Sequence, residues 1–399
     1  MSDLGSVSTL ARSNAQLPVR AYSDAARYVR EIDLLFKRQP RYVGHELMVP
    51  EVGDYHTLAH ERDGRVLVRT RESGADGSAS AGGTASGISL LSNVCRHRQA
   101  IIKTGRGNTD RNIVCPLHRW TYDLEGKLLG APHFDDNPCL NLAHTPLSQW
   151  NGLLFEGPGA VASEVARGVE HEAENEVASE VASELADVRI PELDFSGYVF
   201  DRVEVHECAY NWKTFIEVYL EDYHVGPFHP GLGQFVSCED LSWQYGARHS
   251  VQTVGINSGL KRPGTPTYRA WHDQVMRLSG GVEPEHGAIW LTLYPNVMVE
   301  WYPQVLVVST LIPRGPQHTT NIIEFYYPEE VALFEREFVE ANRAAYMETC
   351  AEDDEIALRM DAGRRALFER SENQVGPYQS PMEDGMQHFH EWLRTEMGE

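Results

Sequence analysis

The alternation of apolar and polar positions predicts short strands in the first half of this chain. Apolar runs at 66–68 and 113–114 lie among turn sequences such as Asp63-Gly64. Runs this short, separated by turns, are typical of a small antiparallel β domain.

The second half combines two kinds of periodicity. Strand-like runs occupy 304–309 and 321–325, and a helix-like pattern follows over 329–369. Strands followed by long helices predict an α+β domain in which helices cover one face of an antiparallel sheet.

Composition refines these boundaries, because two stretches contain too few large apolar residues to build a core. Residues 73–87 are rich in Gly, Ala and Ser and are expected to form a flexible insert, and 157–187 is an acidic stretch with near-repeats of Glu-Val-Ala-Ser. The predicted organisation is therefore an N-terminal helical segment (1–39), a small β domain (40–156), an acidic linker or insert (157–187) and a second domain (188–399).

Two islands of the first domain carry metal-ligand chemistry. They read Cys95-x-His97 and Cys115-x-x-His118. Two thiolates and two imidazoles at this spacing can hold a [2Fe–2S] cluster in which histidines replace cysteines on one iron. Zinc is the alternative, but a zinc finger separates a Cys pair from a His pair, whereas each island here has one of each.

A second constellation lies in the other domain, where His224 and His229 stand five positions apart. Two imidazoles and one carboxylate with open coordination positions are typical of non-haem Fe(II) oxygenases. By itself the pair is weak evidence, because the chain has 17 His. It becomes stronger evidence in a chain that also carries an iron–sulfur motif.

Together these motifs resemble the α subunit of Rieske non-haem iron oxygenases, which include aromatic-ring hydroxylases, choline-monooxygenase-like enzymes and demethylases. The resemblance runs from about Tyr42 to 387–392 and is strongest over 93–98 and 115–122. It implies a small all-β Rieske [2Fe–2S] domain, an α+β helix-grip catalytic domain with an antiparallel sheet, and an N-terminal helix that packs on that catalytic domain.

The resemblance also implies a mononuclear iron held by His224, His229 and a distant carboxylate. The run 352–361 matches the family's final helix when its Ile is placed in register, which makes Asp353 the third ligand and leaves Asp354 as the alternative. The acids of this run could instead cap a helix N-terminus.

An acidic residue three positions before the first iron histidine connects the two metal sites across a subunit boundary in this family. Glu221 occupies that position, with Asp222 as the alternative. On a helix, Glu221 and His224 would share a face, so a surface carboxylate is the competing interpretation of Glu221. For the substrate pocket we expect aromatic residues, although aromatic residues in strands are usually ordinary core: Phe235, Trp290, Tyr294 and Trp301.

The resemblance implies a terminal oxygenase that uses O2 and external electrons to hydroxylate or oxidatively demethylate a small organic molecule. The sequence has no G-x-G-x-x-G turn and no plant-type ferredoxin cysteine set, so a separate reductase, with or without a ferredoxin, must supply the electrons. Family precedent implies a homotrimer. The alternatives are a cis-dihydroxylating α subunit of aromatic compound catabolism and a non-catalytic Rieske electron carrier. Substrate identity, mono- or dioxygenation and the existence of a β subunit stay open.

Composition argues against two kinds of partner, nucleic acid and membrane. The 399 residues carry a net charge of −23, which argues against nucleic acid as a partner. No run of 18 apolar residues and no signal-peptide pattern in residues 1–20 predict a cytoplasmic protein without membrane contact.

Overall fold

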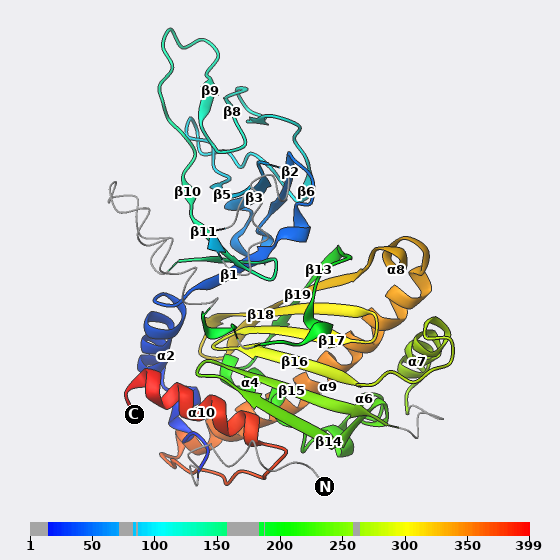
Figure 1. The fold of residues 1–399 in the computed structure, drawn as a ribbon. Helices are drawn as coiled ribbons and strands as arrows, with labels where there is room; N and C mark the ends of the chain where they lie inside the picture. The colour runs from blue at the N-terminus through cyan, green and yellow to red at the C-terminus, as the bar shows by residue number, and fades with distance from the viewer. Residues whose placement is uncertain (1–14, 72–82, 85–86, 158–182, 187, 258–263) are drawn as a thin grey trace. The chain divides into compact units, whose positions relative to one another are not determined.

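The computed structural model describes residues 15–71, 83–84, 87–157, 183–186, 188–257 and 264–399 (Figure 1). The chain divides into two compact units, one formed by 36–188 and the other by 1–35 with 189–399. Most of the predicted insert at 73–87 and of the acidic stretch at 157–187 lies outside the described residues.

The first unit is built from short antiparallel strands. They form sheets in the orders β1-β12-β11-β4, β10-β5-β3-β2-β6 and β7-β8-β9. The strands are β1 (Arg41–His45), β2 (Asp54–Thr57), β3 (Arg65–Arg69), β4 (Gly83–Thr84), β5 (Ile88–Ser92), β6 (Arg106–Asn108), β7 (Ile113–Val114), β8 (Thr121–Tyr122), β9 (Leu128–Gly130), β10 (His144–Thr145), β11 (Leu147–Trp150) and β12 (Leu153–Glu156).

The core of this unit surrounds the two cysteine islands. Val66, Leu91, Trp120 and other apolar side chains form one buried cluster, and the side chains of Cys95 and Cys115 belong to it. The two cysteines are therefore held within a well-packed apolar core.

The second unit contains one antiparallel sheet of seven strands in the order β13-β19-β18-β17-β16-β15-β14. Its strands are β13 (Tyr198–Cys208), β14 (Val236–Tyr245), β15 (His249–Ile256), β16 (Ala288–Leu293), β17 (Val297–Tyr302), β18 (Val305–Gly315) and β19 (His318–Pro328). Its helices are α1 (Arg20–Ser23), α2 (Ala25–Glu31), α4 (Trp212–Tyr219), α5 (Val225–Phe228), α6 (Leu232–Phe235), α7 (Pro266–Leu278), α8 (Glu329–Phe334), α9 (Arg336–Glu369) and α10 (Asp384–Met397).

Polar residues set several helix starts in this unit. Asn211 accepts a hydrogen bond from the Lys213 amide at the start of α4, and Asp24 accepts from two amides of α2. Helix α9 runs along one face of the sheet (Figure 1). The predicted α+β class, with a small antiparallel β domain, is confirmed. One expectation is wrong: the acidic run at 352–355 lies in the middle of α9, so it caps no helix N-terminus.

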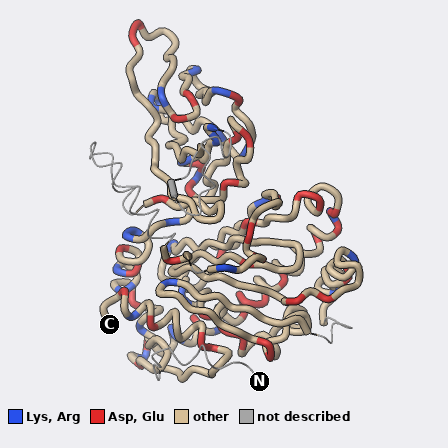
Figure 2. The backbone as a smooth tube through the Cα atoms, viewed as in Figure 1, with Lys and Arg blue, Asp and Glu red and all other residues tan. Residues whose placement is uncertain are grey.

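Figure 2 shows Lys and Arg interspersed with Asp and Glu along the described residues of both units. Over the whole sequence the acids are more numerous, with 58 Asp and Glu against 35 Lys and Arg. Among the residues that the structure describes, no helix is both long and apolar enough to span a membrane.

Candidate functional site

The two cysteine islands of the first unit form equivalent turns. The amide of Cys95 donates to the carbonyl of Ala100, and the amide of Gln99 donates back to the carbonyl of Cys95. Cys115 makes the same two bonds with Trp120 and Arg119. Gln99 and Arg119 both have positive φ, so the backbone path is repeated as well. The two cysteines therefore occupy equivalent places in the two turns, and each turn also carries one His, as a cluster with paired ligands requires.

Within these turns the thiols point inward and the imidazoles lie toward the surface. Cys95 and Cys115 are 2% and 1% exposed, whereas His118 is exposed. Burial raises the pKa of Cys115, and the neighbouring Cys95 thiol raises it further, so the two sulfurs are close together. The rings of His97 and His118 have centroids 4.7 Å apart.

The four side chains thus form two pairs. This arrangement fits a two-iron cluster better than a single zinc ion. Zinc would gather all four ligand atoms within about 4 Å of one another. Among the described residues, these four contribute no set of three ligand atoms within 4.8 Å. Nδ1 of His97 is buried without a hydrogen-bond partner in the described residues, which leaves its lone pair available to a metal. The residues fit a [2Fe–2S] cluster.

Tyr122 lies beside the sulfur pair. Its hydroxyl is 3.5 Å from Sγ of Cys95 and accepts a hydrogen bond from the amide of Arg96. Because the Arg96 amide uses a lone pair of the hydroxyl oxygen, the hydroxyl proton is free to point at Sγ of Cys95. A hydrogen bond donated to a ligand sulfur raises a cluster's reduction potential.

In the second unit, a single helical turn separates the two candidate iron histidines. His224 precedes α5 and His229 follows it directly, so both rings turn to the same side. Their Nε2 atoms are 3.0 Å apart. Helix α4 ends at Tyr219, so Glu221 and His224 lie in the turn after it and share no helix face, which corrects the helical expectation for this pair.

Asp353 on α9 completes the group. Its Oδ1 lies 3.0 Å from Nε2 of His229 and 3.4 Å from Nε2 of His224. A metal with bonds of about 2.1 Å and right-angled ligands separates neighbouring ligand atoms by roughly 3 Å. Burial lowers the pKa of His224, but Asp353 and Glu221 outweigh burial and raise it to about 10. The acids thus favour positive charge here, and the three residues fit a metal with positions left open.

Each histidine contacts a second carboxylate through its other ring nitrogen. Nδ1 of His224 lies 2.5 Å from Glu221, and Nδ1 of His229 lies 2.7 Å from Glu352. Such partners fix the ring orientation and keep Nε2 available as the ligand atom. Asp222 instead accepts a hydrogen bond from Gln252. Sequence reasoning missed Glu352, although its place beside Asp353 was a signal.

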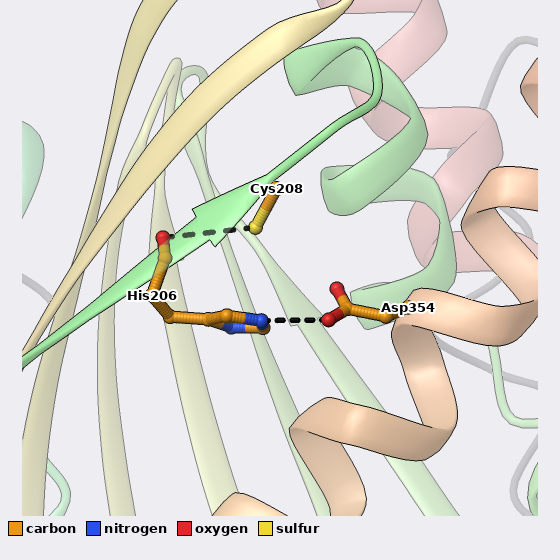
Figure 3. A group of neighbouring side chains, drawn as sticks. All are labelled: His206, Cys208 and Asp354. Carbon is orange, nitrogen blue, oxygen red and sulfur yellow. Dashed lines mark hydrogen bonds and ion pairs between the residues drawn. The ribbon is translucent and has the colours of Figure 1, made fainter.

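Asp354 faces a different group (Figure 3). Its Oδ2 lies 2.7 Å from Nε2 of His206, and its Oδ1 accepts a hydrogen bond from the hydroxyl of Tyr210. Cys208 lies within metal-binding range of both, but burial raises the pKa of its thiol to about 12, and only a thiolate is a good ligand. Asp354 therefore fixes the rotation of α9 while Asp353 faces the histidines.

A cavity with about 720 Å³ of empty volume lies over His224, His229 and Asp353. In the part of the chain that the structure describes, its wall contains the carboxylates of Glu221, Asp222 and Glu300 but no Lys or Arg. The rest is largely aromatic and apolar, including Phe215, Tyr219, Leu232, Tyr268, Trp271, Trp290, Tyr302 and Tyr346.

Of the four aromatic residues expected in this wall, only Trp290 lies there. Trp301 is adjacent to Glu300 on β17 and faces the opposite side of the sheet, because side chains alternate along a strand. Phe235 stacks behind the wall on Trp271, and Tyr294 hydrogen-bonds Ser250 away from the cavity. Glu300 and Tyr302 are among the wall residues that were missed; they lie two positions apart on β17 and share a face, and the pairing of β16 with β17 places Glu300 opposite Trp290.

Comparison with known proteins identifies both domains. Residues 42–145 match the Rieske [2Fe-2S] domain, and residues 195–399 match the ring hydroxylating alpha subunit catalytic domain. A putrescine 2-hydroxylase of Ralstonia nicotianae is 63% identical over 398 residues, with all of both chains covered. The chain belongs to the Rieske non-haem iron oxygenases. This oxygenase is also 52% identical to a putrescine 2-hydroxylase of Bordetella bronchiseptica, covering 100% of this chain and 88% of that relative.

Its fold is similar to a solved quaternary ammonium Rieske monooxygenase, with a TM-score of 0.65 at 19% identity, covering 96% of this chain and 95% of that one. This oxygenase is thus the terminal component that hydroxylates a small molecule, and its two domains imply a [2Fe–2S] cluster and a mononuclear iron. The electron-carrier alternative is wrong, since the catalytic domain is present.

Proposed function

We propose that this oxygenase hydroxylates putrescine, a four-carbon diamine, at C2. The observation that carries the proposal is the charge of the cavity, whose wall, among the described residues, holds carboxylates and no Lys or Arg. A diamine carries two positive charges at neutral pH, and a wall of this kind favours such a ligand over neutral aromatic molecules or carboxylates. The names of the two relatives at 63% and 52% identity support the same substrate.

The reaction consumes R–H, O2, two electrons and two protons and yields R–OH and water. We assign the [2Fe–2S] cluster to Cys95, His97, Cys115 and His118, and the mononuclear iron to His224, His229 and Asp353. When bound, these groups supply electron transfer and O2 activation.

The protein's own side chains position the groups that react. Glu221 and Glu352 hold the two imidazoles with Nε2 toward the cavity, and the aromatic wall excludes water from the reacting carbon. Glu221 is also our candidate for the electron bridge to the cluster of a neighbouring subunit in a homotrimer. A separate reductase, with or without a ferredoxin, delivers the electrons.

The test is O2 uptake by the iron-loaded protein with a surrogate reductase, screened against putrescine, choline, carnitine and naphthalene. Putrescine should stimulate uptake and give a hydroxylated product containing one atom from isotopically labelled O2. Turnover of an aromatic or quaternary compound without turnover of putrescine would refute the substrate. Two labelled atoms in one product would indicate dioxygenation instead.

A further inference from the structure

The cavity wall contains one carboxylate that the metal site does not use. Glu300 lies on β17, is 1% exposed, and is paired in register with Trp290 on β16. Placing a carboxylate in such surroundings is costly unless a partner of opposite charge is present.

Among the described residues, Glu300 accepts hydrogen bonds from neutral donors only. Its Oε1 accepts from the hydroxyl of Tyr346 at 2.8 Å, and its Oε2 accepts from the hydroxyl of Tyr302 at 2.9 Å. Tyr302 is held in turn by Nε1 of Trp290 at 3.0 Å. Burial raises the pKa of Glu300 to about 7, because these two hydroxyls compensate only part of the lost hydration. A carboxylate has about four lone-pair positions, so two remain for a further donor.

Other glutamates of equal burial are neutralised by the protein itself. Glu31, Glu156 and Glu217 are each at most 1% exposed. Glu31 pairs with Lys213, Glu156 with Arg65, and Glu217 with Arg364. Within the described part of the chain, Glu300 forms no ion pair with Lys, Arg or His. It is the exception in this set, and because its side chain lines the cavity, a cation bound there can reach it.

The rings around Glu300 also suit a cation. Ring centroids of Trp290 and Tyr302 are 6.2 Å apart, those of Tyr219 and Trp290 are 6.3 Å apart, and all three rings line the cavity. Aromatic faces attract ammonium groups, most strongly where water is excluded. The hydroxyl of Tyr219 is buried and has no hydrogen-bond partner among the described residues. It is therefore available to hydrogen-bond a ligand in the cavity.

We propose that Glu300, with the rings of Tyr219, Trp290 and Tyr302, binds one primary ammonium group of the substrate. This inference rests on the proposed function and names the residue that recognises the amine. A primary ammonium has three N–H donors for the free lone pairs of Glu300, whereas a quaternary ammonium has none. Glu300 therefore selects primary amines over quaternary amines of similar size.

The experiment compares Glu300→Gln with Glu324→Gln in the iron-loaded protein. Glu324 is a matched control, because it is a buried strand glutamate that also accepts a hydrogen bond from the tyrosine two residues later, yet it does not line the cavity. Calorimetry without O2 should give a loss of putrescine affinity of roughly 30-fold or more for Glu300→Gln, and little change for Glu324→Gln. The inhibition constant of 1,4-butanediol, a neutral analogue of putrescine, should stay within about twofold of the parent value in both variants.

Glu300→Asp keeps the charge and should recover part of the lost affinity. Iron content and the melting temperature of each variant establish that it is folded, and KM should rise more than kcat falls. Parent affinity in Glu300→Gln, an equal loss in Glu324→Gln, or equal weakening of putrescine and 1,4-butanediol would each overturn the inference. If the parent protein neither binds nor hydroxylates putrescine, the proposed function fails first, which is a separate outcome.

Discussion

Oε1 of Glu221 lies 2.5 Å from Nδ1 of His224, on the edge of the imidazole ring opposite to Nε2. Since Nε2 faces His229 and Asp353, the carboxylate fixes both the tautomer and the orientation of a candidate metal ligand without being a ligand itself. The backbone amide of His224 also donates to Glu221, which holds the carboxylate in place.

Glu221→Gln should therefore keep both metal centres and lose most of the turnover. A neutral amide lowers the basicity of His224 and interrupts the proposed electron path, and changes at such partners cost about 10–100-fold. The measurement is single-turnover oxidation of the chemically reduced cluster by O2 and substrate, which should become slow. A parent rate in Glu221→Gln together with a slow rate in Asp222→Asn would move the bridge to Asp222.

Neighbouring acids on α9 allow a second test. Asp353→Ala should lower the iron content from about three to about two atoms per chain, because two imidazoles alone hold Fe(II) weakly. Asp354→Asn should keep all of the iron, since Asp354 contacts His206 and Tyr210. Metal analysis by mass spectrometry gives the answer, and the reverse pattern would show that the ligand is Asp354.

This pair also illustrates what sequence can and cannot provide. Adjacent residues on a helix point about 100° apart, so the choice between them depends on how α9 is rotated, and contacts from distant β13 set that rotation. The cysteine islands were easier, because their ligands are local and their turns are closed by backbone hydrogen bonds within six residues.

Glu300 was missed for a different reason. An acid within the apolar run 297–302 reads as the solvent-facing side of an alternating strand, and only the folded sheet places that side against a cavity. The fold class was predictable because strand-like runs rich in apolar residues, such as 321–325, do become interior strands of the sheet, here β19. The positions of aromatic residues behind or within the wall depend on packing, which periodicity does not encode.

Cys115→Ser should abolish the optical and EPR signals of the cluster while leaving the mononuclear iron bound. The sulfur of Cys115 is 1% exposed beside Cys95 in a unit with its own core, so the second unit should fold without it. Cys139→Ser is the control, because Cys139 is exposed and outside the two turns. Retention of a parent [2Fe–2S] EPR signal in Cys115→Ser would remove this cysteine from the ligand set.

The last prediction concerns acid stability of the second unit. Glu217 on α4 is 1% exposed and pairs with Arg364 on α9 and His390 on α10. Burial alone raises the pKa of Glu217, but Arg364, His390 and the hydroxyl of Tyr22 outweigh it and lower the pKa from 4.5 to about 2. Because the folded-state pKa is depressed, the ionised carboxylate stabilises the fold above pH 4.5 and this contribution is lost as the pH falls from there toward 2.

Glu217→Gln should accordingly lower the free energy of unfolding near pH 7 by on the order of 3 kcal/mol, since the buried guanidinium of Arg364 loses its closer counter-ion and keeps only Asp361, at 3.7 Å. The difference in unfolding free energy between parent and variant should narrow below pH 4.5. Urea unfolding at a series of pH values measures this gap, and pH effects common to both proteins cancel in the difference. Glu355→Gln, at an exposed pair with Arg359, should change stability by less than about 0.5 kcal/mol at every pH. A gap for Glu217→Gln that does not narrow in acid would mean that the carboxylate acts through its shape and hydrogen bonds, because a charge-dependent contribution must disappear when Glu217 is protonated.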